Sequence, residues 1–79
     1  MSEQILTAPS LPKLRKGSKG EAVYVVQLLL VNFHGYSIAT DAHFGPETEN
    51  AIKDLQASRE LSPTGVVDNV TWETLATEA

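Results

Sequence analysis

The sequence of 79 residues contains no cysteine. A chain without cysteine has no disulfide framework, no thiolate zinc site and no cysteine nucleophile. Basic residues are also few, since six lysines and arginines face ten acidic residues and the net charge is -4. This balance argues against the phosphate attraction on which nucleic-acid-binding proteins depend, and against docking on an anionic membrane surface.

Long apolar runs are absent as well, because no stretch approaches the length needed to span a bilayer. The first residues, MSEQILTAPSLP, lack the basic start and the apolar run of a signal peptide. Two locations stay open: the cytoplasm, or the cell wall or periplasm if the chain belongs to a longer exported protein. The length is that of one domain. We expect residues 1–12 to be a flexible tail or linker and residues 13–79 to be the domain.

The first predicted helix follows the stretch GSKGEAVYVVQLLLVNFHG. Ser18 and Glu21 have the spacing of a capping box, apolar residues then recur at helical intervals, and Gly35 supplies a C-terminal stop. This helix is apolar nearly all round, which predicts a central helix buried by the other two. The alternative is an exposed apolar patch, around Val23 or Val31, that meets a partner.

Two further helices follow from cap signals. Gly45 and Pro46 mark the start of one helix, which ends before the turn LSPTG. Asp68 caps another helix, which carries Trp72 and Leu75. With no strand pattern in the chain, the predicted fold class is all-α: a compact three-helix domain.

The chain also contains an internal repeat. DAHFGPETENAI, residues 41–52, aligns with TGVVDNVTWETL, residues 64–75. Each copy reads as a turn, a short extended piece with one large apolar residue, a cap and a helix. One such unit cannot bury its own apolar face, so we expect both units to pack on the first helix.

The order of these motifs resembles the bacterial peptidoglycan-binding domain of the three-helix type. The resemblance covers nearly everything from Leu14 to Leu75. It rests on the following residues: Leu14, Gly17, Gly20, Val23, Gln27, Gly35, Tyr36, Asp41, Phe44, Gly45, Thr48, Ala51, Gln56, Gly65, Thr71, Trp72 and Leu75. The chain departs from the family pattern at Ala42, where the family has glycine, so this turn differs if a positive φ is required.

The resemblance implies a binding module without catalytic activity or cofactor. Its ligand would be peptidoglycan, either the glycan or the stem peptide, and its covalently linked neighbour a hydrolase or amidase domain. We expect a monomer that binds neither nucleic acid nor membrane. The alternative is a protein–protein interaction domain that kept the fold without binding peptidoglycan.

Four residues are candidate ligand contacts: Tyr36, Asp41, His43 and Arg59. Tyr36 offers a ring face, Asp41 an acceptor for sugar hydroxyls or a peptide amine, and Arg59 a cation for an acidic stem peptide. In the competing interpretation, Asp41 caps its own turn, Tyr36 packs on the first helix and Arg59 is solvated.

Other conspicuous side chains favour structural roles. Trp72 lies on the inner stripe of its helix, so core packing is preferred to sugar stacking, and Phe44 is also expected in the core. For Gln27 and Gln56 a structural hydrogen bond to a loop and solvent exposure remain equally open.

A metal site or an acid–base site is disfavoured. His34, His43 and Asp41 lack the spacing of a zinc site, and no fourth ligand is evident. His43 and Asp41 also lack a nucleophile or a partnered base. We therefore expect neither a metal nor catalysis.

Overall fold

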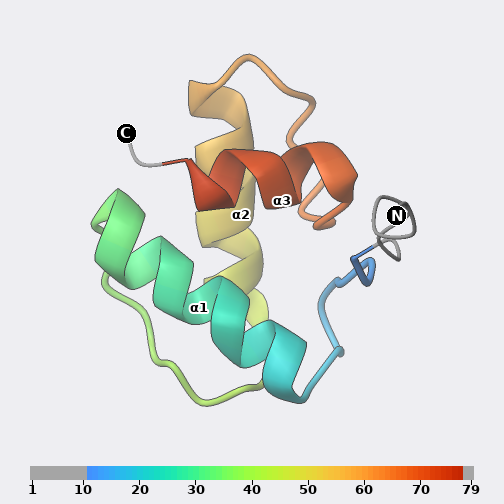
Figure 1. The fold of residues 1–79 in the computed structure, drawn as a ribbon, viewed down its shortest axis with the longest axis vertical. Coiled ribbons are helices and arrows are strands. Elements are labelled where there is room, and N and C mark those ends of the chain that lie inside the picture. Colours follow the sequence, from blue (N-terminus) through green and yellow to red (C-terminus); the bar gives the residue numbers. More distant parts are fainter. Residues whose placement is uncertain (1–10, 78–79) are drawn as a thin grey trace, which may run out of the picture.

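A computed structural model describes residues 11–77, and its ordered elements are α1 (Glu21–His34), α2 (Pro46–Ser58) and α3 (Asn69–Ala76). Figure 1 shows α3 crossing α2, with α1 beside them and a long connection from α1 to α2. Within the described range there is no strand, only two isolated antiparallel bridges, Leu14 with Val67 and Lys19 with His43. The all-α three-helix prediction is confirmed. Most of the predicted tail, residues 1–10, lies outside the described range.

The predicted capping box at the start of α1 is wrong. The N-cap is Gly20, which makes no side-chain cap hydrogen bond. Ser18 instead lies in a segment paired with the stretch before α2, where the amide of Phe44 donates to its carbonyl at 2.9 Å. Its hydroxyl accepts from the amide of Arg15 at 3.1 Å. Tertiary pairing therefore keeps Ser18 out of the helix.

The other helix boundaries agree with the sequence. Gly35 ends α1 in the left-handed conformation with φ of 76°. Gly45 precedes α2 with Pro46 in the first turn, where the missing amide costs nothing. The Asp68 side chain accepts from the amide of Thr71 at 3.0 Å and so caps α3.

The core is formed where the three helices meet the two extended segments. Phe44 and Val67, the apolar residues of the two repeats, are 2% and 0% exposed and lie beneath the helices that they precede. Each such fully buried side chain contributes about 1.5–3 kcal/mol relative to an exposed one. The buried apolar residues are Leu14, Val23, Val26, Leu30, Phe44, Ala51, Ile52, Leu55, Val67, Trp72 and Leu75.

The prediction that α1 is buried on all sides is wrong. Tyr24, Val25 and Phe33 on α1 are 43%, 44% and 39% exposed. Val23 is fully buried and Val31 is half-buried, so the exposed apolar residues are different from those suggested by the alternative. Part of the surface of α1 is therefore apolar and open to solvent.

Hydrogen bonds join the chain segments around this core. The indole nitrogen of Trp72 donates to the carbonyl of Pro12 at 2.7 Å. A ring nitrogen of His34, at the end of α1, lies 2.9 Å from the carbonyl of Leu75 in α3. None of the helices in residues 11–77 has the length and apolar character needed to cross a membrane.

Candidate ligand-binding surface

The surface turn before α2 is held from inside the molecule by Gln27 of α1, which is fully buried. Its Nε2 lies 3.1 Å from Oδ1 of Asp41, 3.0 Å from the carbonyl of His43 and 3.1 Å from Oγ1 of Thr48. Its Oε1 accepts from the amide of Ala42 at 2.8 Å. Because both ends of this buried amide are satisfied, it fixes the turn to α1 and to the first turn of α2.

The turn before α3 is held in the same way by Gln56 of α2. Its Nε2 lies 3.4 Å from Oγ1 of Thr64, 3.0 Å from the carbonyl of Val66 and 3.0 Å from Oγ1 of Thr71. Its Oε1 accepts from the amide of Gly65 at 2.9 Å. The sequence repeat is therefore a repeat of structure, and both glutamines have the structural role that the sequence left open.

The residue after the first position of each turn has a positive φ, which is 66° at Ala42 and 78° at Gly65. Glycine adopts this conformation without strain, whereas in alanine the Cβ clashes with the backbone and raises the energy. A Cβ at Gly65 would also lie 3.0 Å from Cγ of Glu49. The turn with Ala42 thus has the same positive φ as the second turn despite its alanine, while a Cβ in the second turn would be crowded by the side chain of Glu49.

Asp41 and His43 lie together on the first turn and are both exposed. Oδ1 of Asp41 accepts from the His43 amide at 3.0 Å as well as from Gln27. These hydrogen bonds, that of the His43 amide foremost, hold the pKa of Asp41 below its ordinary value. Asp41 does cap its own turn, and it presents a carboxylate to solvent at neutral pH.

Tyr36 lies at the beginning of the connection from α1 to α2, half-buried against the core. Its hydroxyl donates to Oδ2 of Asp54 at 2.7 Å. Burial first, and then the hydrogen bond to Asp54 and its negative charge, raise the pKa of Tyr36 to about 12, while the charge of Arg59 acts in the opposite direction. Tyr36 and Asp54 are therefore joined beside α2, and Arg59 is near enough for its charge to act on Tyr36.

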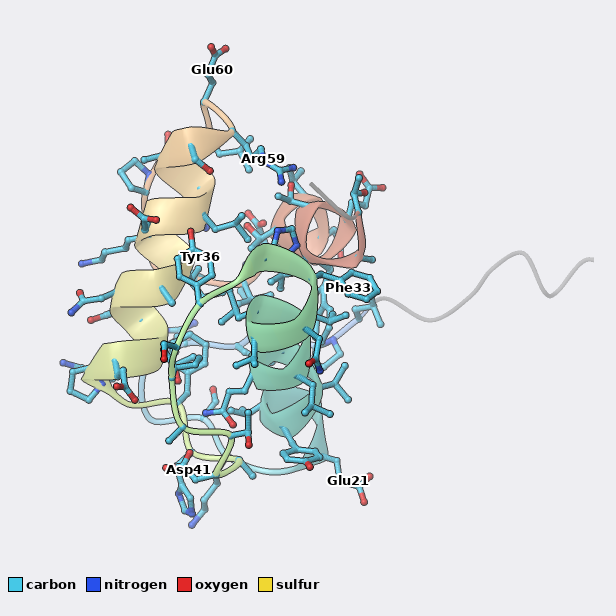
Figure 2. The ribbon with its side chains drawn as sticks, turned by 90° about the vertical axis from the view of Figure 1, so that its left-hand side faces the viewer. Glu21, Phe33, Tyr36, Asp41, Arg59 and Glu60 are labelled. Carbon is cyan, nitrogen blue, oxygen red and sulfur yellow. The ribbon has the colours of Figure 1, made fainter. Side chains whose placement is uncertain are left out.

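The four predicted contact residues fall into two groups. Figure 2 shows Asp41 near one end of the molecule, Arg59 toward the other, and Tyr36 between them. His43 is joined to Asp41 by the turn, and Tyr36 is near Arg59 beside α2. Tyr36, Asp41 and His43 lie on the connection from α1 to α2, whereas Arg59 follows α2, and the four do not converge on a single pocket.

Two hollows that the sequence analysis missed lie at the start of α3. The larger, of about 440 Å³, is lined by Leu11, Lys13, Asp68, Asn69 and Val70. The smaller, of about 230 Å³, lies on the second turn and is lined by Gln56, Leu61, Ser62, Thr64, Asp68, Val70 and Thr71. The residues that line them come from segments far apart in the chain, which sequence patterns do not bring together. The one local signal for these hollows was Val70, an apolar residue at an outward position of its helix.

Sugar stacking on the tryptophan and a shared histidine metal site do not fit the geometry. Trp72 is 6% exposed, so its ring belongs to the core. His34 is in the last turn of α1, whereas His43 pairs with Lys19 just before that helix begins. Within residues 11–77, no three potential metal-ligating side chains gather in one place.

Known proteins are similar to this chain in sequence and fold. The model of the family described as "Putative peptidoglycan binding domain" matches residues 19–75. An uncharacterised protein from the bpoA1 3' region of Kitasatospora aureofaciens is 36% identical over 67 residues, and the match covers 84% of the chain and 57% of the relative.

Solved structures agree with the family match. A fused zinc-dependent amidase/peptidase/peptidoglycan-binding domain-containing protein of Clostridium acetobutylicum is 32% identical, with a TM-score of 0.82 over 86% of this chain and 30% of that one. The endolysin of the Burkholderia phage AP3 is also 32% identical, with a TM-score of 0.79 over 84% and 25% of the two chains. The chain thus spans a minor part of both solved proteins and just over half of the curated relative.

These matches cover the same elements that carry the repeat: α1, both buried glutamine contacts, and the helices that follow each turn. The family match includes most of the chain and the structural matches reproduce its three-helix arrangement. The chain belongs to the peptidoglycan-binding domain family.

Proposed function

We propose that this chain is a non-catalytic module that binds bacterial peptidoglycan. The observation that carries the proposal is the family match over residues 19–75, which takes in all but the last residue of the three helices. The chain therefore supplies attachment to the cell wall, and any wall chemistry belongs to a neighbouring domain. Such a module acts at the cell wall or in the periplasm when its parent protein is exported.

The proposed neighbour is a wall-modifying enzyme. The Clostridium acetobutylicum relative is described as a fused amidase/peptidase with a peptidoglycan-binding domain, and the phage relative is an endolysin. This chain corresponds to under a third of each. Holding a hydrolase or amidase on an insoluble substrate raises its local concentration there, which favours a binding module of this kind.

The proposed contact residues are Tyr36, Asp41, His43 and Arg59. Asp41 offers an exposed carboxylate oxygen for sugar hydroxyls or a peptide amine, and His43 lies beside it. Tyr36 offers its half-buried ring, fixed in place by Asp54, and Arg59 brings a cation to the same group. A long polymer lying along the connection from α1 to α2 would meet both groups.

The exposed apolar surface of α1 favours a second candidate function, protein–protein interaction. Tyr24, Val25 and Phe33 expose a third or more of their surfaces on a single helix. Exposed apolar side chains are typical of surfaces that bind another protein when they form a patch. In this alternative the domain keeps the family fold and binds a protein instead of peptidoglycan.

Co-sedimentation with purified peptidoglycan sacculi tests the proposed function. The folded chain is expected to pellet with sacculi and to remain there at raised salt. Tyr36→Ala, His43→Ala and Arg59→Ala are expected to weaken pelleting, with Lys16→Ala as a control for an exposed residue outside the contact set. Asp41→Asn is preferred to alanine, because it keeps the oxygen that accepts from Gln27. A folded chain that stays in the supernatant would refute peptidoglycan binding and favour the protein-binding alternative.

A further inference from the structure

The two hollows at the start of α3 adjoin each other and form one surface, because Asp68 and Val70 line both. None of the four proposed contact residues lines either hollow. The surface therefore lies outside the contact set along the connection from α1 to α2. The residues that line both hollows, Asp68 and Val70, belong to the second repeat, whereas Asp41 and His43 of the contact set belong to the first.

The rim of the larger hollow is firmly held. Trp72 donates to the carbonyl of Pro12 at 2.7 Å, on one side of Lys13. On the other side, Leu14 and Val67 exchange two backbone hydrogen bonds of 3.1 and 2.8 Å. Lys13 is thus fixed between two anchored neighbours and faces the start of α3. A surface held in this way loses little entropy when a ligand binds.

The lining of the larger hollow combines one charge of each sign with apolar side chains. Lys13 supplies an ammonium group and Asp68 a carboxylate. The amide of Thr71 foremost, and also the charge of Lys13, keep the pKa of Asp68 below its ordinary value, so Asp68 is ionised at neutral pH. Leu11 and Val70 are 53% and 51% exposed, which is high for large apolar residues.

The chemistry of this lining favours the stem peptide of peptidoglycan over its glycan. A sugar ring is usually recognised on an aromatic face, and the described residues around both hollows include no aromatic side chain. A short peptide with small apolar side chains, a free carboxylate and a free amine matches the lining better. The stem peptide of peptidoglycan has this chemistry, with alanine methyl groups, a terminal carboxylate and the side-chain amine of its diamino acid.

We propose that the hollows at the start of α3 bind the stem peptide of peptidoglycan. Lys13 pairs with the terminal carboxylate, Asp68 accepts from the side-chain amine, and Leu11 and Val70 contact the alanine methyl groups. This inference rests on the proposed function and deepens it, because it assigns the peptide to the second repeat.

The test is a titration of the isotopically labelled full chain, followed by amide chemical shifts. The probes are the synthetic pentapeptide L-Ala-γ-D-Glu-L-Lys-D-Ala-D-Ala and, separately, a chitin oligosaccharide. We expect the pentapeptide to shift the amides of Lys13 and of residues 68–71. Lys13→Ala is expected to weaken pentapeptide binding about tenfold, the effect of losing one charge-assisted hydrogen bond. Lys16→Ala removes the same charge outside the hollow and is expected to have no effect.

Asp68 is tested by a matched pair of peptides. Acetylation of the lysine amine removes its charge, so the acetylated pentapeptide is expected to bind the unmodified chain several-fold more weakly. Asp68→Asn keeps the cap of α3, because asparagine caps as well as aspartate, and is expected to abolish this difference. Dispersed amide spectra of both variants would show that they are folded.

The outcomes separate this inference from the function on which it rests. Pentapeptide shifts confined to residues 36–43, or an unchanged affinity in Lys13→Ala, would overturn the assignment of the hollow while leaving peptidoglycan binding intact. Binding of the oligosaccharide alone would do the same. Failure of pentapeptide, oligosaccharide and sacculi together would refute the proposed function itself.

Discussion

Gln27 and Gln56 make the same set of hydrogen bonds in two different places. The Nε2 of each lies within hydrogen-bond distance of the first side chain of a turn, of a carbonyl two residues later and of a threonine hydroxyl in the next helix. Each also accepts from the amide between these two turn residues. Both side chains are at most 2% exposed, so removal of either leaves backbone groups of a turn without partners.

We expect Gln27→Ala and Gln56→Ala each to lower the free energy of unfolding by about 2–4 kcal/mol. The loss combines a cavity with buried donors and acceptors that have no replacement partner. Urea denaturation followed by circular dichroism measures it. Glu73→Ala, on the exposed side of α3, serves as the control and is expected to change stability by less than about 0.5 kcal/mol. If the two glutamine variants lost very different amounts of unfolding free energy, the hydrogen bonds of the two glutamines would not be energetically equivalent.

Ala42→Gly is expected to stabilise the domain by about 0.5–1 kcal/mol. With φ of 66°, Ala42 bears a left-handed strain that glycine avoids, and this gain exceeds the extra entropy of glycine in the unfolded chain. Gly65→Ala is the reverse experiment. It is expected to destabilise by more than Ala42→Gly stabilises, because its Cβ would meet Glu49 at 3.0 Å in addition to the strain. Thermal denaturation of the two variants measures both, and a destabilised Ala42→Gly would contradict the strain argument.

Stability is expected to fall in acid, in part through Asp68. Its folded-state pKa lies below the ordinary value of 3.8, so its contribution is present above that value and is lost as the pH falls through the folded-state pKa. Asp41, whose pKa is also lowered, has the same sign. Asp68→Asn keeps the cap without the titration, so we expect a shallower loss of thermal stability between about pH 5 and about pH 2. An unchanged acid profile in this variant would exclude Asp68 as a contributor.

Tyr36 is expected to ionise late in an alkaline titration. Its pKa is raised to about 12 from 10.0, so its neutral form stabilises the fold below the unfolded value, and this contribution is lost as the pH rises through the folded value. Tyr24→Phe leaves Tyr36 as the only tyrosine, and the ultraviolet absorbance of tyrosinate then reports on it alone. Adding Asp54→Asn removes the charged acceptor and is expected to lower the midpoint. A midpoint unaffected by Asp54→Asn would show that burial alone shifts the pKa.

Local sequence signals correctly predicted those helix boundaries that depend only on the backbone and capping chemistry of nearby residues. Gly35, Pro46 and Asp68 each have a conformational or capping role that holds wherever a helix begins or ends, so the corresponding boundaries are confirmed. Ser18 failed as a cap because residues distant in sequence pair with its backbone. A capping pattern read along the chain contains no information on such pairing.

The surface features were harder to predict than the core. Helical periodicity located α1 but not its buried face, and Tyr24 and Val25 show that a mostly apolar helix need not be enclosed. The hollows were missed because Lys13 meets Asp68 only after the chain has folded through both repeats. For the same reason the sequence grouped Tyr36 with Asp41, whereas the structure joins Tyr36 to Asp54 by a hydrogen bond.

The helix α2 takes part in both sets of glutamine hydrogen bonds, since Thr48 is a partner of Gln27 and Gln56 is itself the second glutamine. Eight residues of helix separate these two positions, a rise of about 12 Å. Because buried hydrogen bonds fix a turn to each end of α2, this helix holds the two surface turns at a constant spacing. A polymer with a regular repeat that touches both turns would be held in register with that spacing, whereas a short fragment would occupy only one of them.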